Sequence, residues 1–131
     1  MKYDPLPEEV DRIGKEIVDS AYRVHKELGP GLLESVYEEC MTYDLRRKGF
    51  KVETQVYIPI EFDGQVLKRN KLRIDMLVED QVIVENKAVA EMIPLFEAQT
   101  LTYLRLGKIR LGYLINYNVT LIKNGIKRFV I

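Results

Sequence analysis

The chain has 131 residues, and its 20 lysines and arginines balance its 20 aspartates and glutamates. Its length and its 47% hydrophobic content exclude a disordered chain and suit one domain over residues 1–131. No apolar stretch is long enough to predict a membrane span, and the polar N-terminal segment does not predict a secretory signal. One cysteine and one histidine argue against a cysteine-rich or histidine-rich metal site. We therefore expect a cytoplasmic protein.

Two helices are predicted in the first 50 residues. Apolar residues recur every three or four positions from Val10 to Leu28, which indicates an amphipathic helix that ends at Gly29-Pro30-Gly31. A second helix is predicted over residues 33–48, because three basic residues occupy its last turn and Gly49 follows as a stop.

The pattern then changes to strands. Apolar residues take the even positions of 52–62, and Pro59, which has no amide hydrogen, indicates an edge strand or a break. Asp63-Gly64 predicts a hairpin turn into a strand over 66–78, whose polar first half should project into solvent. A turn at 79–81 leads to a third strand over 82–88.

The rest of the chain predicts a helix followed by three strands. We expect a helix over 92–106, a strand over 111–117, and two more strands, 119–123 and 126–131, around the hairpin signal Asn124-Gly125. The element order predicts an α/β (α+β) fold with a central mixed sheet flanked by helices.

Three charged residues interrupt the aliphatic strands 66–78 and 82–88. Glu85 and Lys87 are two residues apart, so their side chains share one face. If Val78 pairs with Val82 across the turn, Asp75 lies opposite Glu85, with about 5 Å between their Cβ atoms.

Two carboxylates this close repel each other, and apolar neighbours strengthen the repulsion by removing water. A divalent cation would relieve it, and oxygen ligands without histidine or cysteine favour Mg²⁺ or Mn²⁺. The alternative is that Lys87 simply forms an ion pair with Asp75 or Glu85 on an exposed sheet face.

These residues resemble a known nuclease core. Asp75 followed by Glu85-Asn86-Lys87, on adjacent strands between two helices, looks like the core of the PD-(D/E)xK nucleases. The upstream segment with Gly31, Glu34 and Tyr37 matches the pattern Gly-x-x-Glu-x-x-Tyr, so the sequence resembles the GxxExxY protein family, a branch of that superfamily. The resemblance implies a restriction-endonuclease-like core and phosphodiester hydrolysis that depends on Mg²⁺ (or Mn²⁺).

The resemblance also implies roles for individual residues. Asp75 and Glu85 match the metal-binding carboxylates, together with the backbone carbonyl of Asn86, and Lys87 matches the catalytic lysine. Glu34 matches the acidic residue of the leading helix, which would hold a metal-bound water or a second metal ion; the alternative is that it only stabilises the helix N-terminus. Gln99 and Tyr103 match a polar pair on the helix after the Glu-x-Lys strand. Asn86 stands where an aliphatic residue is usual, and we expect its side chain to face the layer behind the sheet, where it needs a hydrogen-bond partner.

Charge suggests a nucleic-acid surface. Residues 1–100 hold 14 basic and 20 acidic side chains, whereas residues 101–131 hold only basic ones. The candidates for phosphate contacts are Arg105, Lys108, Arg110, Lys123, Lys127 and Arg128. The alternative is an ordinary solvated face that offsets the acidic part of the chain.

The sequence therefore predicts a metal-dependent nuclease that cleaves DNA, with RNA as the alternative substrate. The rival is a catalytically silent nucleic-acid-binding or regulatory module that keeps the nuclease fold. A homodimer through the edge strand 52–62 is a further expectation, since members of the superfamily often pair to cut both strands.

Overall fold

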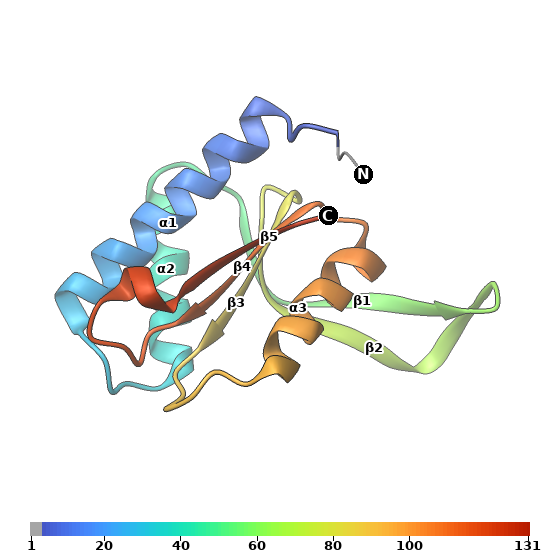
Figure 1. The fold of residues 1–131 in the computed structure, drawn as a ribbon. Helices are drawn as coiled ribbons and strands as arrows, with labels where there is room; N and C mark the ends of the chain where they lie inside the picture. The colour runs from blue at the N-terminus through green and yellow to red at the C-terminus, as the bar shows by residue number, and fades with distance from the viewer. Residues whose placement is uncertain (1–3) are drawn as a thin grey trace.

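The computed structural model describes residues 4–131 (Figure 1). The helices are α1 (Glu8–Leu28), α2 (Glu34–Arg47) and α3 (Pro94–Gly107), with a short 3₁₀ helix, η1 (Ile122–Gly125). The strands are β1 (Val52–Phe62), β2 (Gln65–Val78), β3 (Val82–Lys87), β4 (Leu111–Asn116) and β5 (Ile126–Val130). None of the helices in this part of the chain has the length and apolar character needed to cross a bilayer.

The five strands form one mixed sheet in sequence order, β1-β2-β3-β4-β5. Only β3 and β4 are parallel, and α3 makes the crossover between them, which a parallel pair requires. The other three pairs are antiparallel. The predicted mixed sheet flanked by helices is therefore confirmed.

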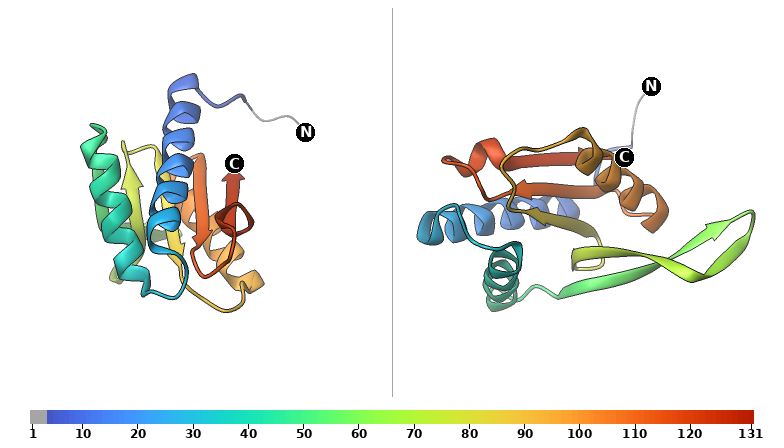
Figure 2. Two further views of the ribbon diagram at one scale, coloured as in Figure 1. Left: turned by 90° about the vertical axis from the view of Figure 1, so that its left-hand side faces the viewer. Right: turned by 90° about the horizontal axis from the view of Figure 1, so that it is seen from below.

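Helices cover both faces of the sheet. Figure 2 shows α1 and α2 together on one face and α3 on the other. The larger apolar cluster lies under α1 and α2, where Ile13, Ile17 and Met41 are fully buried. The smaller cluster joins Ile74 and Ile83 to Leu104 of α3. The two faces are thus closed by separate cores.

The connection between α1 and α2 is held by a buried tyrosine. The Tyr37 hydroxyl donates to the carbonyl of Gly29 at 2.7 Å and accepts from the N–H of Leu32 at 3.1 Å. Gly31, between them, has a φ of 99°, which a residue with a side chain rarely adopts. The Tyr37 ring stacks on Tyr117, with centroids 4.3 Å apart. The glycine and the tyrosine of the motif therefore shape this loop.

The strand predicted over 119–123 is wrong. Residues 119–121 form no strand, and 122–125 form η1. The His25 imidazole Nε2 hydrogen-bonds the carbonyl of Val119 at 2.8 Å, which ties the segment to α1. Gly125 packs directly against the backbone of Asn116, where a Cβ atom would collide with the carbonyl oxygen. Because of these contacts the chain turns from β4 into β5 without an intervening strand.

The outer parts of β1 and β2 extend beyond the rest of the molecule (Figures 1 and 2). β1 is an edge strand, and its pairing with β2 shifts register between Pro59 and Glu61. Both alternatives predicted for Pro59, an edge and a break, are therefore confirmed.

Replacing Tyr37 with Phe should destabilise the fold. The change removes the hydroxyl that bonds both the Gly29 carbonyl and the Leu32 N–H, and the loss of these two part-buried hydrogen bonds should lower the free energy of unfolding by about 1–3 kcal/mol. Urea denaturation would measure it. Tyr43→Phe, in the same helix but 69% exposed, is the matched control and should change little. Equal stability of the two variants would contradict the role assigned to Tyr37.

Candidate functional site

The pairing of β2 with β3 stops just before two carboxylates. The bridged pairs are Val78–Val82, Leu77–Ile83 and Met76–Val84, which confirms the predicted turn and register. At the next position Asp75 faces Glu85 without a backbone bridge. Instead, the Asp75 N–H donates to Glu85 Oε2 at 2.7 Å, and the Asn86 N–H donates to Asp75 Oδ2 at 2.8 Å. The two carboxylates thus take the hydrogen bonds that end the ladder.

Glu85 lies in an environment that disfavours its charge. The residue is 7% exposed. Burial first, and the negative charge of Asp75 second, raise the pKa of Glu85 to about 8, although the hydrogen bond from the Asp75 backbone and the charge of Lys87 oppose the shift. Two ionised carboxylates at this position would therefore be stabilised by a nearby cation.

The donor set fits a hard divalent cation. Asp75 and Glu85 offer carboxylate oxygens, with no histidine or cysteine beside them. Over residues 4–131, no group of three or more His, Cys, Asp or Glu side chains comes together as a metal site. Mg²⁺ commonly takes one or two protein carboxylates and fills its other positions with water and substrate phosphate. Two carboxylates therefore suit Mg²⁺ or Mn²⁺ better than an ion that needs a complete protein cage.

Lys87 and Asn86 leave β3 on opposite faces. The Lys87 ammonium lies over the Phe96 ring of α3, 4.3 Å from its centroid. Asn86 is 2% exposed, and its Nδ2 donates to Met76 Sδ at 3.2 Å. The expected orientation of Asn86 into the layer behind the sheet is therefore confirmed. Its buried Oδ1 has no hydrogen-bond partner in the described chain.

Two glutamates of α2 lie one turn apart, and the second of them, Glu38, is close to the carboxylate pair. Glu34 is the first residue of α2 and is half-buried. Glu38 lies one turn later, where burial first and the charge of Asp75 second raise its pKa. Its charge in turn contributes to the raised pKa of Glu85. Sequence reasoning missed Glu38, although its spacing of four residues from Glu34 puts it on the same helix face.

The β1 residue next to Asp75 has an unusual backbone. Gln55 lies between the bridged pairs Thr54–Met76 and Val56–Ile74, is itself unpaired, and has a φ of 53°. Its side-chain Nε2 donates to Glu38 Oε1 at 2.9 Å. A non-glycine residue in this region is strained, and such residues cluster at functional sites. Both ladders of β2 are therefore interrupted at Asp75.

Tyr103, one residue of the predicted pair on α3, is close enough to the carboxylates for their charge to affect its pKa. Burial, and then the charges of Glu85 and Asp75, raise the pKa of Tyr103, whereas the charge of Arg73 lowers it. Gln99 is half-buried one turn earlier, and its side chain forms no hydrogen bond within residues 4–131. Arg73, two residues before Asp75 on β2, is a second residue near the site that sequence reasoning did not select.

The six predicted phosphate ligands fall into two groups. Arg110 donates to the carbonyls of Ile131, Pro5 and Asp4. Lys127 pairs with Glu97 at 2.9 Å, and Arg128 pairs with Asp11 at 3.1 Å. Three of the six thus already have partners in the fold. The others, Arg105, Lys108 and Lys123, are exposed and form no ion pair with any described residue.

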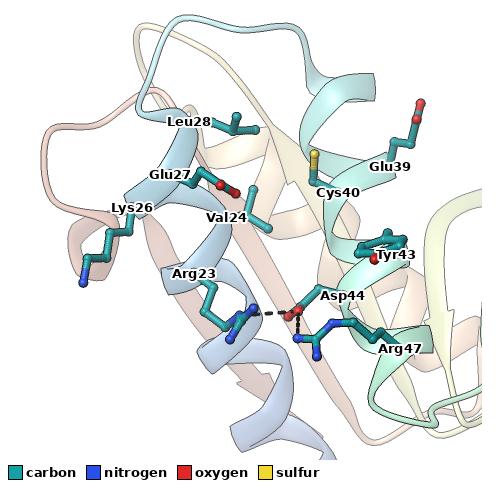
Figure 3. A pocket seen from close by; sticks show the side chains of 10 residues that line it. All are labelled: Arg23, Val24, Lys26, Glu27, Leu28, Glu39, Cys40, Tyr43, Asp44 and Arg47. Atoms are coloured by element: carbon teal, nitrogen blue, oxygen red, sulfur yellow. Dashed lines mark hydrogen bonds and ion pairs between the residues drawn. The ribbon is translucent and has the colours of Figure 1, made fainter.

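A groove lies elsewhere on the molecule. An open groove of about 760 Å³ runs between α1 and α2 (Figure 3). Asp44 lies in it, held by Arg23 at 3.4 Å and Arg47 at 2.8 Å. Asp75, Glu85 and Lys87 do not line this groove. It is therefore separate from the carboxylate pair.

Comparison with known proteins gives one finding. A family model described as the PD-(D/E)XK nuclease superfamily matches residues 11–129, almost the whole chain. Neither a curated protein nor a solved structure matches it. The matched range includes α2, the carboxylate pair, Lys87 and α3.

Glu85→Gln should stabilise the metal-free protein. The pKa of Glu85 is higher in the folded chain than its usual 4.5, so the folded state binds more protons between about pH 4.5 and 8, and stability should fall as the pH rises through this range. Glutamine can still accept the Asp75 N–H without the charge.

Since one pKa unit corresponds to about 1.4 kcal/mol, we expect the variant to exceed the wild type by at least about 1 kcal/mol in the free energy of unfolding at pH 8, measured by urea denaturation with a chelator present. Glu91→Gln, at an exposed position, is the control. A Glu85→Gln protein less stable than the wild type at pH 8 would contradict the strain described here.

Proposed function

We propose that this chain, which belongs to the PD-(D/E)XK nuclease superfamily, is a metal-dependent nuclease that hydrolyses phosphodiester bonds of DNA. The observation that carries the proposal is the convergence of Asp75 and Glu85 at the end of the β2–β3 ladder, with Glu85 buried. A surface ion pair, the alternative reading of the same residues, would not place a carboxylate that is 7% exposed against another carboxylate.

We assign the metal to Asp75 and Glu85, with the backbone carbonyl of Asn86 as a further oxygen ligand. A divalent cation bound there would polarise a phosphoryl oxygen and lower the pKa of a water molecule. Because backbone N–H donors fix Asp75 and Glu85, the two carboxylates would hold such a cation in a set position. Mg²⁺ or Mn²⁺ fits this oxygen donor set.

Lys87 orients the attacking water and offsets the charge that develops on the phosphoryl oxygens. Its positive charge lowers the pKa of Glu85, and its ammonium packs over the Phe96 ring of α3. Such preorganised charge stabilises the transition state without reorganisation at the moment of reaction. Tyr103 and Gln99 of α3 complete the site as hydrogen-bonding groups toward the substrate.

The acidic residue from α2 is Glu34 by motif, and Glu38 by proximity. Glu38 is the one whose pKa responds to Asp75 and which Gln55 holds by a hydrogen bond. We therefore propose that Glu38 would hold a metal-bound water and that Glu34, at the start of α2, has a supporting role.

The proposal extends to the whole molecule. We take residues 1–131 as one nuclease domain of the GxxExxY branch, because Gly31, Glu34 and Tyr37 match that motif. A cytoplasmic location and a homodimer formed through β1 stay predictions. The free edge of β1 supports the second of these.

Mn²⁺ should raise the melting temperature of the wild type. A ligand that binds only the folded state at 100 times its dissociation constant stabilises by about 2.7 kcal/mol. Asp75→Asn should remove most of this rise, while Asp63→Asn, in the exposed hairpin turn, should keep it. An unchanged melting temperature of the wild type in millimolar Mn²⁺ and Mg²⁺ would rule out the metal site.

Lys87→Ala should abolish cleavage but retain the Mn²⁺-induced rise in melting temperature. Cleavage of labelled single-stranded, duplex and branched DNA and RNA would be followed on gels, with Lys15→Ala on α1 as the matched control. Loss of one preorganised charge in such a site costs about 10²–10³ in rate. If the wild type cuts none of these substrates with Mn²⁺ present, the protein is instead a silent binding module.

The two α2 glutamates can be separated by the same assay. Glu38→Gln should lower the cleavage rate by at least about tenfold, since it removes a charge close to the carboxylate pair. Glu34→Gln should have the smaller effect. A larger loss of cleavage in Glu34→Gln than in Glu38→Gln would instead assign this role to Glu34.

A further inference from the structure

The outer part of the β1–β2 hairpin, residues 57–73, forms an arm that stands clear of the body. Its strands pair only with each other, because β3 bridges β2 only at residues 76–78. Figures 1 and 2 show it projecting away from all three helices. Within the arm only Ile58, Ile60, Leu67 and Leu72 are half-buried, and all its other residues are exposed. A two-stranded ribbon gains little stability by itself in water, so its length points to a use outside the fold.

The arm is cationic along one strand. Four of the six residues from 68 to 73 are basic and none is acidic. Lys68, Arg69, Lys71 and Arg73 are all exposed, and none forms an ion pair within residues 4–131. This contrasts with Arg110, Lys127 and Arg128, which have partners inside the fold. The arm thus offers unpaired positive charge to a polyanion.

The arm is also the direct continuation of the strand that carries Asp75. Lys68 lies seven positions before Asp75, which corresponds to about 23 Å of extended strand. The end of α3 meets its base, because Gly107 packs against Ile58. A phosphate held by the arm therefore lies less than one helical turn of duplex from a phosphate at the carboxylate pair.

The shape of the arm selects among nucleic acids. The major groove of B-form DNA is wide enough for a two-stranded ribbon, whereas the major groove of A-form RNA is deep and narrow. At the tip Phe62 is 75% exposed and Val66 is 56% exposed, and such side chains contact bases rather than phosphates. A second copy that paired through the β2 edge of the arm would bring two cationic strands together, which their repulsion disfavours.

We propose that the arm, residues 57–73, is a duplex-DNA-binding element in which Lys68, Arg69 and Lys71 contact the phosphates beside the cleavage site. This inference rests on the proposed nuclease function and names its substrate class as duplex DNA rather than RNA. It also moves the main phosphate contacts from the C-terminal basic residues to β2.

The test compares two triple variants with the same loss of charge. K68Q/R69Q/K71Q alters the arm, and R105Q/K108Q/K123Q alters the three C-terminal cations without ion pairs. Arg73 is left unchanged because its charge acts near the carboxylate pair. A third variant, K68R/R69K/K71R, keeps the charge of the arm. The probes are fluorescent duplexes of about two helical turns, as DNA and as RNA of the same sequence, measured by anisotropy in EDTA.

We expect the arm variant to bind duplex DNA at least tenfold more weakly at about 0.1 M salt, with the slope of log K against log salt reduced by about 3. The C-terminal variant should lose less, the charge-preserving variant should bind as the wild type does, and wild-type affinity for duplex RNA should be lower than for DNA. Wild-type affinity of the arm variant, or equal binding of RNA and DNA, would overturn the inference.

Two further measurements separate this inference from its premise. Cleavage by the wild type tests the nuclease function, so an arm variant that binds normally while the wild type cuts DNA overturns the arm alone. Sedimentation of the wild type and the arm variant without DNA tests self-association. A dimer that the arm variant alone dissociates would assign the arm to a second copy of the chain and overturn the inference.

Discussion

Two carboxyl groups are held side by side by the backbone of neighbouring strands. Asp75 and Glu85 each accept an N–H from the opposite strand at the point where the β2–β3 ladder ends. This arrangement keeps the carboxylates close without a cation, at the cost of a raised pKa at Glu85. The other site residues are placed around it: Glu38 from α2, Tyr103 from α3 and Lys87 from β3 itself. The proposed divalent-cation site therefore depends on how this ladder ends.

Much of the fold follows from local patterns. Alternation and turn signals predict β1 to β4 closely, because strand faces and hairpin turns depend on neighbouring residues. The errors arise where packing decides. Residues 119–121 have strand composition but are drawn to α1 by His25. In α3 Leu104 is buried whereas Leu95 and Ala98 are exposed, because apolar residues occur on several sides of this helix and the contact with the sheet determines which side is buried.

Some residues of the candidate site could likewise be predicted from the sequence, and others could not. Asp75 and Glu85 could be predicted because the register follows from counting residues across one short turn. Glu38 could not be separated from Glu34, because that choice depends on how α2 sits against the sheet. The left-handed Gln55 carries no sequence signal, since a glutamine rarely adopts that conformation. The basic segment of β2 was expected in solvent, but the length of the arm became visible only from where β3 ends.

The parallel pairing of β3 with β4 also bears on how the chain folds. The β2–β3 hairpin closes over three turn residues, whereas β4 must wait for the whole segment from Ala88 to Arg110 to form α3 and return. Contacts across such long loops form late, because closure entropy opposes them. We therefore expect Asp75 and Glu85 to meet early, while still hydrated, and Glu85 to lose water when the crossover docks. The affinity for a cation should accordingly mature in the last stage of folding.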